Sequence, residues 1–313
     1  RWSSIREKTH PMFRRLGRQF RQLISLRELN LEQEILQRLK DPEPFRLDEG
    51  QFYLQLSPLS AEIEDAKLAA RGEMPEDASI ALYEHFTHRL RPQTFVRSDQ
   101  IPSVVQYLKG HQEDCKIWLG LADQAQKRNF KILQDEPFSF AAAIDWYSDL
   151  CGKSFPFGHV NELESHFDFE IQQQALGSSR SAFANANPPG PIERAFLLNQ
   201  LNHFMDLARG YWISGNEAYV SEYVAQIIDW ADKNPPMYGV AWLHPRGIAH
   251  RARNLTVSFL MMLDSPQLRN ENCAKILGQI LVHGSYLSAL LEKGCRDQLA
   301  VASSLYILAA HFP

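Results

Sequence analysis

The sequence predicts an all-α protein built of antiparallel helices, with a less regular N-terminal region and long loops. After Ile192, apolar residues recur with the 3.6-residue period of a helix almost to the end of the chain. The breaks between these helical segments are short, and short connections join neighbouring helices that run in opposite directions.

The C-terminal helices carry the clearest boundary signals. Gly215 suits the left-handed position that follows a helix, Asn216 suits an N-cap, and Pro245 suits a first helical turn. The last helix is apolar on all sides, so we expect other helices to cover it on all sides. The predicted helices span 194–213, 216–232, 246–263, 267–292 and 297–311.

Residues 1–130 are expected to form a separate N-terminal helical region. A Pro- and Gly-rich stretch, 131–191, follows it and is too interrupted for long helices. Loops of this length are often functional, and this one carries Asp145-Trp146-Tyr147. The elements expected in the N-terminal region are a helix within 1–40, a possible strand over 51–56, a helix over 77–90, and two helices between 101 and 130 that are interrupted near Gly110.

The composition narrows the function classes. The chain has 313 residues, of which 44% are hydrophobic and 22% charged, as in an ordinary globular protein. The net charge of −4 gives no reason to expect nucleic acid as a partner. No apolar run reaches the roughly 18 residues that span a membrane, so we expect no membrane insertion. The composition is silent on oligomeric state.

The cysteines point away from metal and cofactor chemistry. The four of them are scattered without CxxC spacing, which argues against a zinc site and against a disulfide framework. We expect no metal, and nothing in the sequence indicates a cofactor, so none is expected. The chain shows no signal peptide and opens with Arg1, which leaves a cytoplasmic location open.

A series of short motifs resembles one known family. In order, they are the IDW of 144–146, an Asn199-x3-His203 helix, the SGNEAY of 214–219, the DWADKNPP of 229–236, the GVAW of 239–242 and a helix bearing Arg251. This order resembles the N-terminal α/α-toroid domain of the heparinase II/III family of polysaccharide lyases, including its alginate-lyase relatives. The resemblance extends from about residue 135 to residue 313.

The resemblance implies a fold and an activity. Residues 131–313 would form the first part of an (α/α) toroid, an incomplete ring of antiparallel helix pairs. The rest of the toroid and a C-terminal β-sandwich domain are presumed absent from this chain. The family implies β-elimination on an acidic, uronate-containing polysaccharide, and a periplasmic or extracellular location.

Such a lyase removes the proton on C5 of a hexuronic acid and expels the oxygen on C4. The protein must neutralise the neighbouring carboxylate with Asn, Arg or a protonated acid, because negative charge builds up there. It must also place a base near C5 and an acid near O4.

His203 and Asp297 are the candidate catalytic residues. A single His on a partly apolar helix face is either a catalyst or a hydrogen-bonded core residue. Asp297 follows Arg296, where the family has an Asn-His pair. The Arg296-Asp297 pair is either a salt bridge that replaces the family pair or an altered catalytic pair.

The remaining candidates are substrate-binding. Trp146 is either a sugar platform or an anchor for its loop, and Asn199 and Asn202 either line a cleft or cap a nearby loop. Trp242, His244 and Arg246, within five residues of one loop, form the closest cluster of side chains suited to an anionic sugar. Arg251 is expected instead to hold that loop through hydrogen bonds. The full set is Asp145, Trp146, Asn199, Asn202, Trp242, His244, Arg246 and Arg251.

Two departures from the family pattern keep other functions open. Residues 294–299 lack the family Asn, and Gln200 stands where the family helix has Arg. One alternative is a catalytically altered, glycan-binding relative that takes part in exopolysaccharide handling. The other is an α/α-toroid glycoside hydrolase, which needs two carboxylates about 5–9.5 Å apart. Asp145 and Asp297 are the loop acids that we nominate for it.

Overall fold

The computed structural model describes most of the C-terminal half of the chain and parts of the rest. The helix predicted within 1–40, much of the loop 131–191, and Arg296 lie outside the described residues. The described residues are 52, 53, 56, 61–72, 74–89, 100–131, 138–140, 143–150, 152, 154–160, 163, 191–293 and 297–312.

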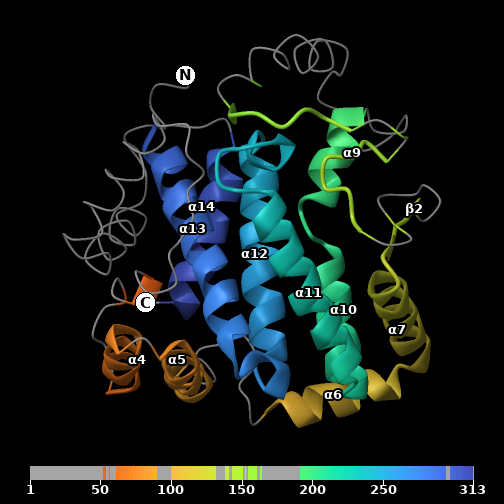
Figure 1. Cartoon of the computed structure of the whole chain (residues 1–313). Coiled ribbons are helices and arrows are strands. Elements are labelled where there is room, and N and C mark those ends of the chain that lie inside the picture. The colour runs from red at the N-terminus through yellow and green to blue at the C-terminus, as the bar shows by residue number, and fades with distance from the viewer. Residues whose placement is uncertain are drawn as a thin grey trace, which may run out of the picture.

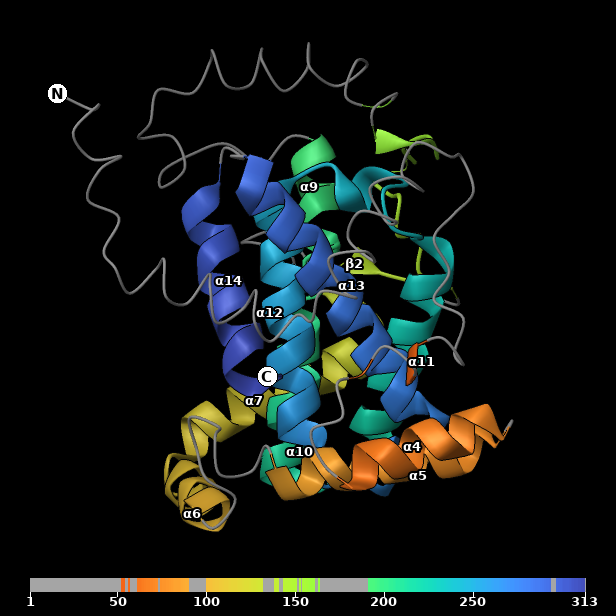
Figure 2. The ribbon, with the colours of Figure 1, turned by 90° about the vertical axis from the view of Figure 1, so that its left-hand side faces the viewer.

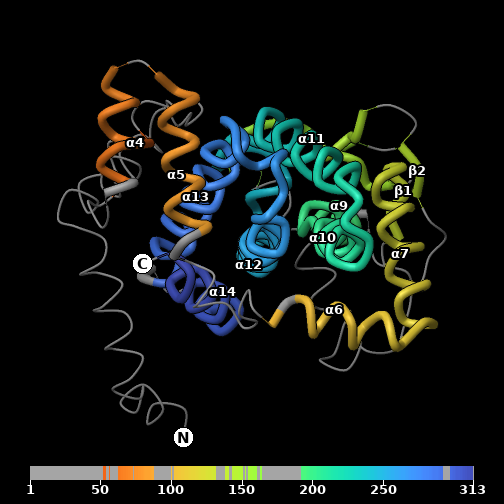
Figure 3. The backbone as a smooth tube through the Cα atoms, turned by 90° about the horizontal axis from the view of Figure 1, so that it is seen from below, coloured from red at the N-terminus to blue at the C-terminus, as the bar shows by residue number. Residues whose placement is uncertain are grey.

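Two rows of helices form the body of the protein, which confirms the all-α toroid prediction. Helices α10 (His203–Ser214), α12 (Pro245–Met262) and α14 (Gln298–His311) pack side by side in one row. Helices α11 (Glu217–Lys233) and α13 (Glu271–Lys293) form the second row, which packs against the first (Figure 3).

Successive helices alternate in direction. In Figure 1, α10, α12 and α14 run downward, whereas α11 and α13 run upward. The N-terminal ends of α12 and α14 therefore lie together at the upper end of the molecule. The 3₁₀ turns η4 (Val240–Trp242) and η5 (Pro266–Leu268) lie in the loops before α12 and α13.

The predicted boundary signals of the C-terminal helices are confirmed. Gly215 adopts the left-handed conformation with φ of 69° and ends α10. The Asn216 side chain accepts a hydrogen bond from the backbone nitrogen of Ala218 and caps α11. Pro245 occupies the first turn of α12. These signals are local, so the sequence was sufficient to locate them.

The predicted helix 194–213 is wrong in one respect. The structure has two helices there, α9 (Pro191–Leu198) and α10, separated by a break at 199–202. Leu201 takes a left-handed φ of 54°, which costs a residue with a Cβ about 1–2 kcal/mol. The Leu201 side chain is fully buried, and this burial offsets the strain.

Helices from the predicted N-terminal region pack directly on the two rows. Helix α5 (Pro75–Arg89) pairs with α4 (Ala61–Arg71) and contacts α13. Helix α7 (Gln112–Gln126) packs along α10 and follows α6 (Ile101–Gly110). Helices α4, α5 and α6 lie across the lower end of the molecule (Figure 2). A domain boundary at residue 130 stays a prediction.

Two further expectations about elements can be compared with the structure. Phe52 and Tyr53 are helical, so the strand considered over 51–56 is wrong at these residues. The last helix is expected to be covered on all sides. Helix α14 packs on α12 and α13, but Leu299 and Tyr306 on it are 85% and 52% exposed, so the described residues cover it only in part.

The described strands are β1 (Asn129–Phe130) and β2 (Phe138–Ser139), which pair in antiparallel fashion.

A glycine allows the close approach of α7 and α10. A Cβ added to Gly210 would lie 2.5 Å from the Cβ of Ala122 on the neighbouring helix. No side-chain adjustment can relieve that contact, because both atoms are fixed to the backbone. The sequence pattern did not indicate this constraint.

We expect Gly210→Ala to lower the free energy of unfolding by about 1–3 kcal/mol, because the two helices must separate. The matched control is Gly120→Ala on α7, where an added Cβ would meet nothing within 4 Å. The control should be neutral or stabilising by up to about 1 kcal/mol, because Ala favours a helix over Gly. Urea unfolding of the three proteins measures both changes, and equal stabilities would contradict the close packing.

Candidate functional site

Arg251 lies fully buried between the α9–α10 break, the loop before α12 and helix α13. Its Nη1 donates hydrogen bonds to the carbonyl oxygens of Asn199 and Ala241, both at 3.0 Å. Its Nε donates to Nε2 of His283 at 2.8 Å. One guanidinium therefore joins the α9–α10 break, the η4 turn and helix α13.

The positive charge of Arg251 is stabilised by aromatic rings and carbonyls. The guanidinium carbon lies 4.5 Å from the ring centroid of Trp230 and 5.0 Å from that of Trp242. Burial lowers the pKa of Arg251 to about 9. Burial, and then the charge of Arg251, hold the pKa of His283 well below its usual value, so His283 is neutral and accepts the bond.

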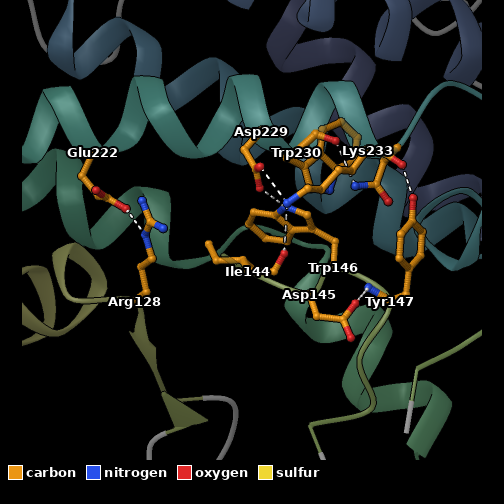
Figure 4. Close-up of polar contacts among 10 residues, drawn as sticks. Arg128, Ile144, Asp145, Trp146, Tyr147, Glu222, Asp229, Trp230 and Lys233 are labelled. Atoms are coloured by element: carbon orange, nitrogen blue, oxygen red, sulfur yellow. Dashed lines mark hydrogen bonds and ion pairs between the residues drawn. The ribbon is translucent and has the colours of Figure 1, made fainter. Parts of the chain in front are cut away.

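Burial excludes several predicted substrate contacts. Trp146 and Trp242 are 0% and 1% exposed, so neither ring presents a face at the surface, and for Trp146 this burial favours the loop anchor of the two roles considered. The indole nitrogen of Trp146 donates to Asp229 at 2.8 Å, as Figure 4 shows. That of Trp242 donates to the carbonyl oxygen of Asn234 at 3.0 Å. Arg251 is likewise a structural residue with no access to a glycan.

Asn199 and Asp145 also hold loops in place. The Asn199 amide nitrogen donates to the Trp146 carbonyl at 2.8 Å, and its side-chain oxygen accepts from Trp230 at 2.9 Å. Asn199 is 1% exposed, so it caps the loop and lines no cleft. One carboxylate oxygen of Asp145 accepts from the backbone nitrogen of Tyr147 (Figure 4), and the other accepts from Ser154.

Accessible polar residues gather at the start of α12. The Arg246 guanidinium is half-exposed and donates to Asp297 at 2.9 Å. The Nε2 of His244 lies 3.9 Å from the other Asp297 oxygen, and the His244 ring stacks on Phe196 at 5.0 Å. Asp297 thus pairs across the loops with Arg246, while its predicted partner Arg296 lies outside the described residues.

A second part of this surface joins α12 to the α9–α10 break. The Asn254 amide donates to the Gln200 carbonyl and to the Asn202 side-chain oxygen, both at 2.8 Å. The Nδ1 of His250 lies 3.3 Å from the Gln200 side-chain oxygen. We call the following residues the α12 polar patch: Gln200, Asn202, His244, Arg246, His250 and Asp297.

The charge of the patch acts on His250. Burial lowers the pKa of His250, and the positive charges of Arg253, Arg246 and His244 add to this effect, whereas Asp297 opposes it. Burial and the neighbouring positive charges thus both disfavour the protonated form of His250.

His203 lines a pocket beside the patch. The pocket has a volume of about 120 Å³, and Asn202, Lys131 and Asp206 also line it. The Nε2 of His203 lies 2.8 Å from the side-chain oxygen of Gln226. The amide nitrogen of Gln226 donates elsewhere, so its oxygen accepts and His203 carries its proton on Nε2.

The surroundings of His203 make it a weak proton carrier. Its ring stacks on Phe130 with centroids 4.2 Å apart, and burial lowers its pKa to about 3. A neutral imidazole with so low a pKa is a poor general base near neutral pH and has no proton to spare as an acid. The geometry favours the hydrogen-bonded core role that the sequence left open.

Sequence reasoning missed His250 and Asn254, and it named Gln200 without assigning it to the site. One signal could have found the first two. Arg246, His250 and Asn254 are spaced four residues apart, which places them on one face of a helix. Gln200 was noted only as a departure from the family. Its contact with α12 depends on the break in the preceding helix, which local sequence did not reveal.

The described part of the chain has neither a membrane-spanning helix nor an evident metal centre. No described helix is long and apolar enough to cross a membrane. Nor do His, Cys, Asp or Glu side chains in the described residues gather in threes to hold a metal ion.

Comparison with known proteins identifies the family. The profile described as Heparinase II/III N-terminus matches residues 122–313. This is more than half of the chain, and the chain belongs to the heparinase II/III family. No curated protein matches the sequence.

Solved structures of lyases share the fold. The heparan sulfate lyase HepC from Pedobacter heparinus is similar with a TM-score of 0.54 and 16% identity, covering 84% of this chain and 36% of that one. The heparinase III BT4657 gene product is similar with a TM-score of 0.56 and 18% identity, covering 86% of this chain and 37% of that one. The chain thus spans little more than a third of these proteins.

We expect Arg251→Met to lower the free energy of unfolding by about 3 kcal/mol or more, because two buried carbonyls and His283 lose their donor. The matched control is Arg253→Met on the same helix, which is only partly buried and should change stability by no more than about 0.5 kcal/mol. Urea unfolding measures both. Equal stabilities of the two variants would contradict the central position of Arg251.

The low pKa of His203 predicts a pH effect on stability. In the unfolded chain His203 takes up a proton below about pH 6.5, whereas the folded protein resists it down to about pH 3. His203 therefore contributes stability above pH 6.5, and this contribution falls by about 1.4 kcal/mol per unit as the pH drops between these values.

Replacing His203 by Gln should remove this part of the pH dependence. Urea unfolding of both proteins at pH 7 and pH 5 measures it. The variant should lose less stability than the parent protein between the two values, while the difference between them should be constant from pH 7 to pH 8. Parallel losses down to pH 5 would show that His203 protonates in the folded protein.

Proposed function

We propose that this protein is a polysaccharide lyase-like member of its family that acts by β-elimination on an acidic, uronate-containing glycan. The α12 polar patch would bind the glycan. The observation that carries the proposal is the half-exposed Arg246, paired with Asp297 and surrounded by amides and imidazoles.

The electrostatics of the upper end support an anionic ligand. Helices α12 and α14 both begin there (Figure 1), and the N-terminal end of a helix carries partial positive charge. A uronate carboxylate could replace Asp297 on the Arg246 guanidinium, which suits bidentate binding of carboxylates. The amides of Gln200 and Asn202 would supply further hydrogen bonds to the sugar.

The patch contains groups that can move a proton. We propose that Asp297 and His244, which face each other at 3.9 Å, take part in removing the C5 proton or in protonating O4. His203 would have a structural role, because it lines the pocket beside Asn202 and does not transfer a proton. An acidic polysaccharide as substrate also favours a periplasmic or extracellular location.

A catalytically altered, glycan-binding relative is the second candidate. The salt bridge between Arg246 and Asp297 and the very low pKa of His203 favour it, because both reduce the groups ready for catalysis. A hydrolase has no such support, because both carboxylate oxygens of Asp145 already accept hydrogen bonds within their own loop.

Incubation with heparan sulfate, alginate and other acidic polysaccharides tests the proposal. We expect a product with an unsaturated uronate at its new end, detected by ultraviolet absorbance. Arg246→Ala should lower the rate of product formation at least about tenfold, because the substrate carboxylate loses a charge-assisted partner worth more than about 1.4 kcal/mol.

The matched control is Arg269→Ala, an exposed arginine paired with Glu84 at the other end of the molecule. It should form product at the parent rate. Binding without an unsaturated product would favour the glycan-binding alternative. If no acidic polysaccharide is bound or cleaved, the proposal is wrong.

A further inference from the structure

Two aromatic rings, the exposed Phe157 and the partly buried Tyr238, stack on each other from two neighbouring loops. Phe157 is 57% exposed, although large apolar side chains are mostly covered in folded proteins. Its ring stacks on that of Tyr238, with centroids 5.5 Å apart and planes 19° apart. The edge of this pair is supported by Tyr147, whose ring meets Phe157 at 6.0 Å in a T-shaped arrangement.

Backbone contacts hold together the two loops that carry the rings. His159 and Tyr238 form an antiparallel β-bridge between the two loops. The backbone nitrogen of Gly239 donates to the Gly158 carbonyl, and that of Val160 donates to the Met237 carbonyl, each at 2.9 Å. A rigid pair of rings loses little conformational entropy when a ligand covers it.

Gly239 is required for this arrangement. Its φ of 74° lies in the left-handed region, and a Cβ there would come within 2.9 Å of the Tyr147 ring. Only glycine lets the loop pass so close to Tyr147, which in turn positions Phe157.

The ring pair and the α12 polar patch are connected through one small buried cluster. Phe155 and Val240, each two residues from a ring of the pair, belong to one small buried cluster. Phe196 and Leu243 pack on the same cluster, and Phe196 stacks on His244 of the patch. The two surfaces are therefore fixed relative to each other.

The separation between the two surfaces suits an oligosaccharide. Six residues lead from Tyr238 to His244, and part of this stretch is the η4 turn, so the Cα atoms of the two residues lie within about 20 Å of each other. Figure 1 shows the start of α12 and helix α9 together at the upper end of the molecule.

We propose that Phe157 and Tyr238 form a stacking platform for a pyranose ring of the acidic glycan whose carboxylate lies on the α12 polar patch. This inference rests on the proposed function. One face of a pyranose carries only C–H groups and is apolar, so it gains by covering an exposed aromatic ring. Phe157 and Tyr238 would thus take the stacking role that the buried Trp146 and Trp242 have no exposed face to perform.

Titration calorimetry of the protein with alginate and heparan sulfate oligosaccharides tests the platform. We expect Phe157→Ala to weaken binding by about three- to tenfold. The loss should be similar at low and high salt, because stacking involves no net charge. By contrast, the effect of Arg246→Ala should shrink as salt screens the charge.

Phe157→Trp provides an independent test. This variant should retain binding, and its emission should shift to shorter wavelength when an oligosaccharide covers the new indole. The matched control is Tyr107→Ala on α6, another exposed aromatic residue, 67% exposed, whose ring contacts His111. It lies at the opposite end of the molecule and should bind like the parent protein.

The outcomes separate the platform from the proposed function. If the parent protein binds and Phe157→Ala binds equally well, the platform is wrong and the proposed function stands. If Tyr107→Ala weakens binding as much as Phe157→Ala, the platform is also wrong. If the parent protein binds none of the oligosaccharides, both the platform and the proposed function are overturned.

Discussion

The buried guanidinium of Arg251 is the interaction on which the rest of the site depends. It is enclosed by the rings of Trp230 and Trp242 and hydrogen-bonded to carbonyls of two separate loops. A charge removed from water must be compensated wherever it lies, and here aromatic faces and backbone dipoles compensate it. Because these partners belong to different segments, α12 can keep its charge buried only while both loops hold their positions.

This constraint divides the predicted site residues by depth. Those that touch Arg251 or its rings are scaffold, and Asn202, His244, Arg246 and Asp297 belong to the more exposed α12 polar patch. The ligand that we propose is an acidic glycan, in keeping with the family to which this chain belongs. In our proposal Arg246 meets the charge of this glycan, and Phe157 and Tyr238 meet the apolar face of one of its rings.

Much of the fold could be predicted because its signals are local. Gly215 and Asn216 act within one helical turn, and the apolar period of α12 or α13 extends over many residues. The break at 199–202 could not be predicted, because the apolar period continues through it. It exists because Leu201 gains burial and Asn199 bonds to Trp146 and Trp230, which are distant in sequence.

The sequence alone determined the family, the helices and the general region of the site, since these follow from periodicity, capping residues and the order of short motifs. Only the tertiary structure decided which of those residues a ligand can reach. Trp242 and Phe157 are equally plausible sugar platforms as letters in a sequence, yet one is enclosed by α11 and α13 and the other is exposed. Exposure depends on how the helices pack around a residue, and no local pattern records it.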